Sequence, residues 1–256
     1  MWEGAIPTTS LSSFALACEA AAEVVQLRRL ARAFLRVRGV RRISYHLVEA
    51  IAGPGPPVVQ AEGFPDDWVR HYVEHALFEV DPITALSARR TQPFFWSDVN
   101  RITRLSPEET AFMRQLETAD LGDGLAMQVY GPNMRNAYVG LGFGLPRPDL
   151  TSAQIFELKS AVQIAHLRFC ELTAAQVAVA RDLSPREQEI LAWIARGKSN
   201  GVIAEILGVS RHTVDTNIRR IFDKLGVSDR TSAVLRGLGT GVLLMDRSPG
   251  SRDRVT

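Results

Sequence analysis

The stretch LSPREQEILAWIARGKSNGVIAEILGVSRHTVDTNIRRIFDKLGV, residues 183–227, determines the C-terminal fold of this 256-residue chain. It begins with Ser184-Pro185-Arg186-Glu187, a capping box with proline at the first helical position. Gly197 then provides a C-cap, because glycine readily adopts the left-handed conformation that ends a helix. A second, short helix is expected over 200–207, and Gly208-Val209-Ser210 has the length of a turn that joins two helices at a steep angle.

The third helix of this stretch has an apolar stripe and a polar face. It follows Ser210 as its cap, and its apolar residues recur at helical spacing: Val214, Ile218, Ile221 and Leu225. At about 100° per residue, the opposite side of this helix is polar and carries His212, Asp215, Thr216, Arg219 and Asp223. Arg220 lies on the flank of this polar side. A fourth helix is expected over 228–238. A tight turn followed by a longer, arginine-bearing helix fits the major groove of DNA, which is roughly 12 Å wide.

The distribution of charge is consistent with a DNA partner. The whole chain has a formal net charge of only +2, too small to establish one. Residues 183–244 contain nine basic and six acidic residues, so this segment carries +3 and holds the positive excess. A helical bundle with a solvated charged face is the alternative that these residues alone leave open.

Residues 183–240 closely resemble the LuxR-type helix-turn-helix. The resemblance is carried by Leu183-Ser184-Pro185-Arg186-Glu187, Ile190-Leu191, Gly197-Lys198-Ser199-Asn200, Ile203-Ala204, Leu207-Gly208-Val209-Ser210, Thr213-Val214 and Lys224-Leu225-Gly226-Val227 with Arg230. It implies binding to double-stranded DNA.

The same resemblance assigns roles to individual residues. It implies that three residues are structural, as cap, core and C-cap: Glu187, Leu191 and Gly197. It implies base contacts from Asp215, Thr216 and Arg219, and we expect phosphate contacts from Arg211, Thr213 and Arg220. Gly201 departs from the family, which often has an acidic residue there, and this should weaken the first turn of its helix.

The overall composition is that of an ordinary globular protein, with 46% hydrophobic and 23% charged residues. No apolar run approaches 18 residues, and the N-terminus lacks the basic-then-apolar order of a signal peptide, so we expect a cytoplasmic protein with no membrane partner. The two cysteines, Cys18 and Cys170, are far apart and provide no material for a disulfide framework or a cysteine-built metal site.

The expected fold class is α+β, with an N-terminal α/β/α sandwich around a mainly antiparallel sheet and an all-α four-helix helix-turn-helix domain after it. The expected domains are 1–172 and 183–245, with a linker at 173–182 and a disordered tail at 246–256. The first domain should contain these elements: a helix over 14–38 with its arginines solvated, strands over 43–47 and from 58 around a turn at 53–57, helices over 65–77 and 82–89, a strand over 93–96, a helix from 106, a hairpin of 124–130 with 138–143, and a helix over 151–172.

A second resemblance covers about 160 residues of the N-terminal part. Trp68, Tyr72, Asp81-Pro82 and Trp96 keep the spacing of the acyl-homoserine-lactone-binding domain of LuxR-type quorum-sensing regulators. It implies that the Trp68 indole N–H donates to the lactone carbonyl, that Asp81 accepts from the ligand amide N–H, and that aromatic side chains wall the pocket. The full predicted ligand set is Trp68, Tyr72, Asp81, Trp96, Phe64, Tyr45, Met127 and Gly142. Without the resemblance, Asp81 is an N-cap and Trp68 with Tyr72 are core residues.

Two residues depart from this family's pattern. Phe64 replaces a frequent tyrosine and Gly142 replaces a serine or threonine of the late strand, so two hydroxyls that bond the acyl carbonyl are missing. We expect ligand recognition to depend more on apolar contact, and Gly140, Gly142 and Gly144 to leave room for a long or bulky acyl group.

Two other functional classes are disfavoured. A phosphorylated receiver domain would need alternating strands and helices, which this chain lacks. The segment His71-Tyr72-Val73-Glu74-His75 matches the H-x-x-E-H signature of inverted zinc proteases, but no third ligand is identifiable, and a zinc hydrolase is only a remote alternative.

The function expected from these features is quorum-sensing transcriptional regulation. The chain should bind an N-acyl-homoserine lactone, with no other cofactor and no metal, and bind an inverted-repeat operator as a homodimer, since each subunit would contact one half-site. Activation with RNA polymerase as a partner is expected. Response to a different small molecule, or release from DNA on ligand binding, is the alternative.

Overall fold

The computed structural model describes residues 10–48, 58–144, 147–174 and 183–243. They fall into two compact units, one built around a β-sheet and one built from the C-terminal helices. The expected turn at 53–57, most of the expected linker and the expected tail lie outside the described residues. None of the described helices is long and apolar enough to cross a membrane.

The sheet of the first unit has five strands in the order β2-β1-β5-β4-β3, and every neighbouring pair is antiparallel. Their bounds are β1 Arg42–Val48, β2 Val58–Glu62, β3 Phe94–Phe95, β4 Gly124–Val129 and β5 Asn136–Gly142, with the short helix η3 (Pro132–Met134) between the last two. The register pairs Tyr45 with Val139 and His46 with Tyr138. The predicted hairpin and the predicted antiparallel sheet are confirmed.

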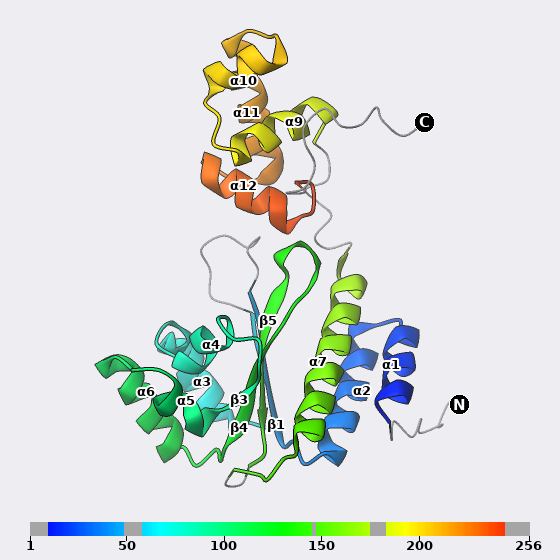
Figure 1. The fold of residues 1–256 in the computed structure, drawn as a ribbon, viewed down its shortest axis with the longest axis vertical. Helices are drawn as coiled ribbons and strands as arrows, with labels where there is room; N and C mark the ends of the chain where they lie inside the picture. Colours follow the sequence, from blue (N-terminus) through cyan, green and yellow to red (C-terminus); the bar gives the residue numbers. More distant parts are fainter. Residues whose placement is uncertain (1–9, 49–57, 145–146, 175–182, 244–256) are drawn as a thin grey trace. The chain divides into compact units, whose positions relative to one another are not determined.

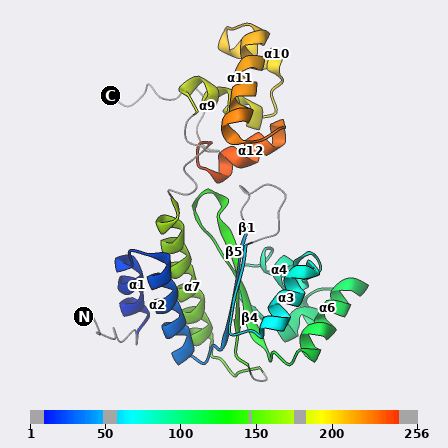
Figure 2. The ribbon, with the colours of Figure 1, turned by 180° about the vertical axis from the view of Figure 1, so that it is seen from behind.

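Helices cover both faces of this sheet (Figures 1 and 2). One face is covered by α1 (Leu11–Ala20), α2 (Val24–Val37) and α7 (Ser152–Leu172). The other carries a group of shorter helices: α3 (Asp66–Glu74), η1 (Leu77–Glu79), α4 (Pro82–Ser87), η2 (Trp96–Asp98), α5 (Val99–Ile102) and α6 (Pro107–Thr118). The predicted α/β/α arrangement is therefore confirmed.

The N-terminal helix differs from its prediction. One helix was expected over 14–38, but the chain forms α1 and α2 with a break between them. The carbonyl oxygen of Ala21 in the break accepts hydrogen bonds from Nε and Nη2 of Arg168, at 3.1 and 2.7 Å. Because Arg168 belongs to α7, the partner that satisfies this helix end comes from 147 residues further along the chain.

The segment of the predicted ligand residues is also more broken than expected. The helix predicted over 65–77 ends at Glu74, because Ala76 adopts a left-handed conformation with φ 49° before η1. The predicted strand over 93–96 is reduced to Phe94–Phe95, and Trp96 begins η2 instead. These changes of direction bring Tyr72 and Trp96 into one core.

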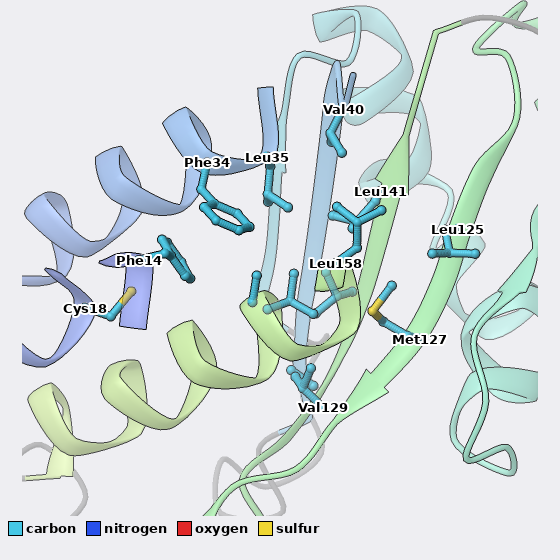
Figure 3. Close-up of a cluster of buried hydrophobic side chains, with 14 of the residues drawn as sticks. Phe14, Cys18, Phe34, Leu35, Val40, Leu125, Met127, Val129, Leu141 and Leu158 are labelled. Atoms are coloured by element: carbon cyan, nitrogen blue, oxygen red, sulfur yellow. The ribbon is translucent and has the colours of Figure 1, made fainter. Parts of the chain in front are cut away.

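Each face of the sheet has its own hydrophobic core. Figure 3 shows the core under α1, α2 and α7, where Phe14 and Phe34 stack with ring centroids 4.3 Å apart and Met127 lies with Leu158. The core on the opposite face is more aromatic and contains Tyr72, Phe94, Trp96, Phe112 and Tyr138. This aromatic core includes four of the eight predicted ligand residues: Phe64, Trp68, Tyr72 and Trp96.

The second unit consists of α9 (Pro185–Ala195), α10 (Asn200–Leu207), α11 (Arg211–Leu225) and α12 (Arg230–Gly239), as predicted. The Ser184 capping box forms with both reciprocal hydrogen bonds, and Ser210 caps α11. Gly208 and Gly226 end α10 and α11 with φ 63°, a conformation that favours glycine. The predicted stripe of α11 is buried: Val214, Ile218, Ile221 and Leu225.

Candidate functional site

A small cavity lies on the aromatic face of the sheet. Its walls include five of the predicted ligand residues, which the fold collects from separate elements: Phe64, Trp68, Tyr72, Asp81 and Trp96. Three further wall residues with polar side chains were not predicted: Ser44, His46 and Tyr138. The volume of the cavity is about 50 Å³, which is room for only a few water molecules.

Asp81 is the buried acid of this cavity. Its Oδ1 accepts hydrogen bonds from the backbone N–H of Ile83 at 2.8 Å and of Thr84 at 3.4 Å, so it is the N-cap of α4. Its Oδ2 accepts a hydrogen bond from the Tyr72 hydroxyl at 2.9 Å. Burial raises the pKa of Asp81 to about 6, although these hydrogen bonds partly offset the effect. The carboxyl group therefore titrates near neutral pH.

Tyr138 and Trp96 fill the space beside the glycines of the sheet. A Cβ on Gly140 would overlap with the Tyr138 hydroxyl and Ser44 Oγ, and a Cβ on Gly142 would lie 3.1 Å from the Trp96 ring. The room that these glycines were expected to leave for an acyl chain is thus occupied by aromatic rings. Gly144 lies beside Arg41 and Arg42 instead. Gly142 is not among the residues that line the cavity; it accommodates Trp96.

The polar atoms of these rings face a low-dielectric environment. Burial raises the pKa of Tyr138 well above its usual range, with Ser44 and Trp96 partly offsetting this. The indole N–H of Trp96 is close enough to affect the Tyr138 hydroxyl, but it makes no well-aligned hydrogen bond among the described residues. A buried N–H donor without such a bond is available to a ligand acceptor.

His46 is the unpredicted ionisable residue of the cavity. Its ring lies 5.0 Å from that of Tyr138 and 5.7 Å from that of Tyr72, measured between centroids. Burial lowers the pKa of His46 to about 4, so its imidazole is neutral at physiological pH. The alternation of polar Ser44 and His46 along β1 was the signal that could have identified both residues.

Tyr45 and Met127 were predicted as ligand residues, but both lie on the opposite face of the sheet. Successive side chains of a strand point to opposite faces, so Tyr45 points away from its neighbours Ser44 and His46. Met127 belongs to the core under α7 (Figure 3). Neither residue lines the first cavity, because a shift of one position along a strand exchanges the two faces of the sheet.

The outer surface of α11 carries most of the predicted DNA contacts. Arg211, Thr213, Arg219 and Arg220 are exposed. Thr216 is half-buried, and its Oγ1 donates a hydrogen bond to the carbonyl of His212 at 2.9 Å. The exposed guanidinium groups of α11 can therefore reach a phosphate or a guanine edge without loss of an internal ion pair among the described residues.

Asp215 has a different environment from the other predicted base contacts. Its Oδ1 accepts a hydrogen bond from Asn200 Nδ2 at 2.7 Å, and Asn200 Oδ1 accepts one from Arg230 Nη1 at 2.9 Å. Arg230 also donates to the carbonyl of Lys198. This bridge joins α10, α11 and α12, and it gives Asp215 a structural partner that the helical wheel did not reveal.

The three residues expected to be structural have such positions. Glu187 is buried, and its carboxylate accepts hydrogen bonds from the Ser184 N–H at 2.6 Å and from Lys224 Nζ at 2.8 Å. Burial alone would raise the pKa of Glu187, but these bonds outweigh it and lower the pKa. Leu191 is fully buried, and Gly197 has φ +74° after α9.

Comparison with known families agrees with this geometry. Residues 23–169 match the family described as autoinducer binding domain, and residues 181–236 match the bacterial regulatory proteins of the luxR family. The chain belongs to the LuxR family of quorum-sensing transcriptional regulators. The resemblance noted from sequence is thereby confirmed.

Individual relatives cover most of this LuxR-type chain. The transcriptional activator protein AhyR of Aeromonas hydrophila is 25% identical over 225 residues, which is 86% of each chain. The quorum sensing-dependent regulator VjbR of Brucella abortus is 31% identical over 193 residues, 71% of this chain and 72% of VjbR. The crystal structure of SdiA from Escherichia coli superposes with a TM-score of 0.73 at 19% identity, covering 91% of this chain and 98% of SdiA.

The family also decides the enzyme alternative. The relatives are transcriptional regulators and not enzymes. His71 and His75 lie on and just after α3 with ring centroids 4.4 Å apart, and His71 Nε2 is 3.1 Å from Gln115 Oε1. Within the described residues, no group of three or more His, Cys, Asp or Glu side chains could hold a metal ion.

Proposed function

We propose that this chain is a cytoplasmic quorum-sensing regulator that binds an N-acyl-homoserine lactone in the cavity beside Asp81. The observation that supports this proposal is the convergence of Trp68, Tyr72, Asp81 and Trp96 on one cavity. A neutral ligand with one amide and an apolar chain needs an acceptor, one or two donors and apolar walls. Those groups are present here in that combination.

The proposed contacts follow from the positions of the polar atoms. Asp81 accepts from the ligand amide N–H, with Tyr72 orienting the carboxylate through its hydroxyl. Trp68 donates its indole N–H to the lactone carbonyl. The hydroxyl groups of Ser44 and Tyr138 provide donors for the acyl carbonyl, which compensates for the hydroxyls missing at Phe64 and Gly142.

The size of the cavity makes ligand binding dependent on side-chain movement. Small-molecule sites usually have volumes of roughly 300–1,000 Å³, whereas this cavity has about 50 Å³. Rotation of the Tyr138 or Trp96 ring would open it, because these rings occupy the space above Gly140 and Gly142. We therefore expect slow, induced-fit association with the lactone.

The ligand proposal is tested by thermal shift and calorimetry with homoserine lactones of different acyl length. Asp81→Asn preserves an N-cap side chain and a hydrogen-bond acceptor but removes the charge. We expect lactone affinity to fall about tenfold or more, since hydrogen bonds to a charged group contribute roughly 1.5–3 kcal/mol. Octanoyl-glycerol is the comparison ligand, because the structure of SdiA in complex with octanoyl-rac-glycerol superposes on this chain with a TM-score of 0.71 at 17% identity. Binding of octanoyl-glycerol but of no lactone would support the alternative small molecule.

We further propose that a homodimer binds an inverted-repeat operator through α11. Arg219 and Thr216 are the proposed base contacts, and Arg211, Thr213 and Arg220 the proposed phosphate contacts. Asp215 is less available for cytosine than its sequence position suggested, because Asn200 already donates to it.

The DNA contacts are tested by binding of a selected operator and a random duplex. Arg219→Ala should cost about 1–3 kcal/mol on the operator and relax specificity at one base position. Arg220→Ala should weaken both duplexes alike and flatten the salt dependence. Equal loss on both duplexes for Arg219→Ala would refute its assignment as a base contact.

The proposed output is activation of transcription through RNA polymerase. Ligand bound to the folded protein alone would stabilise it by RT ln(1 + [L]/Kd), about 2.7 kcal/mol at a hundredfold excess over Kd. More folded protein is then available to bind DNA. Transcription in vitro with purified polymerase tests the sign: a lactone-dependent rise supports activation, and lactone-dependent release from the operator supports the opposite response.

A further inference from the structure

A second cavity lies on the other face of the sheet, between α2, α7 and the strands β1 and β2. Figure 1 shows both helices along this face. Its volume is about 330 Å³, which is within the roughly 300–1,000 Å³ range of small-molecule sites. None of the residues around the first cavity lines it.

The inner wall of this second cavity is apolar. Leu27 and Leu35 come from α2, Val139 from β5 and Val162 from α7, and all four are buried. The two polar side chains of this inner wall are within hydrogen-bond distance of each other, since the Tyr45 hydroxyl lies 2.8 Å from Nδ1 of the buried His166. A hydrocarbon chain can occupy such a wall without displacing a hydrogen bond.

The mouth of the cavity is cationic. Arg28 and Arg32 of α2 line it, and both are exposed. Glu62 of β2 forms an ion pair with Arg32 and lies 3.9 Å from Arg36, so its carboxylate is shared by those two arginines. Arg28 lies one turn earlier on α2 and has no ion pair among the described residues. Its guanidinium group is therefore placed to receive an anion at the opening of an apolar cavity.

We propose that this second cavity binds a single-chain carboxylate amphiphile, the class of a medium-chain fatty acid, with the carboxylate on Arg28 and the chain along Leu27, Val139 and Val162. The charge at the mouth selects an anion, and the planar guanidinium pairs with a carboxylate through two parallel hydrogen bonds. The apolar depth selects an unbranched chain. The site is separate from the proposed lactone site, and the proposal does not depend on it.

Titration calorimetry of the full-length chain with decanoate, and with decanol as the neutral probe of equal length, tests this proposal. Decanoate should bind at one site, and decanol about tenfold more weakly, equivalent to roughly 1.4 kcal/mol. Arg28→Gln should weaken decanoate binding about tenfold and leave decanol unchanged. The matched control is Arg29→Gln, because Arg29 is exposed on the same helix but does not line the cavity.

Two further variants assign the location of binding. Ala165→Phe fills the cavity from α7 and should abolish decanoate binding, with folding checked by circular dichroism. Asp81→Asn should leave decanoate binding unchanged. Absence of heat up to the solubility limit of decanoate would overturn the proposal, as would binding that Arg28→Gln leaves unaltered. Loss of decanoate binding in Asp81→Asn, or its displacement by octanoyl-homoserine lactone, would move the amphiphile to the first cavity and also overturn it.

Discussion

The Tyr72 hydroxyl donates a 2.9 Å hydrogen bond to Oδ2 of Asp81, and both side chains are buried in one wall of the first cavity. The other oxygen of the carboxylate caps α4. A carboxylate has about four lone-pair sites, so Asp81 can still accept from a ligand. Asp81 thus caps a helix and keeps lone pairs for the proposed ligand contact, so the two sequence-based interpretations of Asp81 are compatible.

Tyr72→Phe should destabilise the first unit. The substitution removes the only side-chain donor to Asp81 among the described residues. Because the buried Asp81 carboxylate then has one hydrogen bond fewer, we expect the free energy of unfolding to fall by about 1–3 kcal/mol. Unfolding in denaturant, together with hydrogen exchange of the backbone amides of β4 and β5, measures this loss of stability. Tyr130→Phe is the matched control, since Tyr130 is exposed and its hydroxyl makes no hydrogen bond among the described residues. Equal effects of the two variants would show that the hydrogen bond contributes little.

Asp81 should make the first unit less stable as pH rises. Its folded-state pKa of about 6 exceeds the ordinary 3.8, so the folded state binds more protons between these values. The stability that Asp81 contributes to the folded state is fully present below about pH 4 and is lost as pH rises through 6. With 1.36 kcal/mol for each pH unit, it amounts to roughly 3 kcal/mol.

His46 should act in the opposite direction over nearly the same range. Its folded-state pKa of about 4 is below the ordinary 6.5, so its contribution is complete above 6.5 and is lost as pH falls through 4. The wild-type chain should therefore show little change in stability between pH 4 and 6. Asp81→Asn should become more stable as pH rises, and His46→Gln less stable. Denaturation at several pH values tests this, and identical slopes for the three proteins would contradict the pKa shifts.

Two glycines of the second unit should respond oppositely to alanine. Gly201 lies in α10, and the nearest atom to an added Cβ is 4.0 Å away, so Gly201→Ala should raise stability by about 0.5–1 kcal/mol. Gly197 has equally open surroundings but a φ of +74°. Gly197→Ala should lower stability by about 1 kcal/mol, because alanine is strained in that conformation. Thermal unfolding measures both, and the same sign in both variants would contradict the backbone argument.

Glu187 should be more important to the second unit than its partner Lys224. The Glu187 side chain is only 3% exposed and the Lys224 side chain 39%. Lys224→Met leaves a buried carboxylate without its cation, and we expect a loss of up to about 3 kcal/mol. Glu187→Ala also removes the reciprocal bond of the cap, so it should cost more. Unfolding in denaturant measures the loss of stability in each variant. A larger loss in Lys224→Met than in Glu187→Ala would contradict this prediction.

Local features were predictable where neighbours in sequence provide the partner. The Ser184 capping box forms as expected, and Ser106 forms a second one, because the reciprocal hydrogen bonds join residues three apart. The break between α1 and α2 was missed, since its partner Arg168 comes from α7. Asp215 was placed correctly on α11, but its bond to Asn200 depends on how α10 packs.

The sequence by itself determined the order and type of most helices and strands, the helix-turn-helix and the family, because these depend on spacing, caps and turns. Only the tertiary structure decided which side of the sheet faces each cavity. Both faces of this sheet are covered by helices, so alternation along β1 is compatible with either assignment. In the folded chain, the rings of Tyr72 from α3 and Tyr138 from β5 pack against His46. His46 therefore faces the first cavity, and Tyr45 lies on the side of α2 and α7.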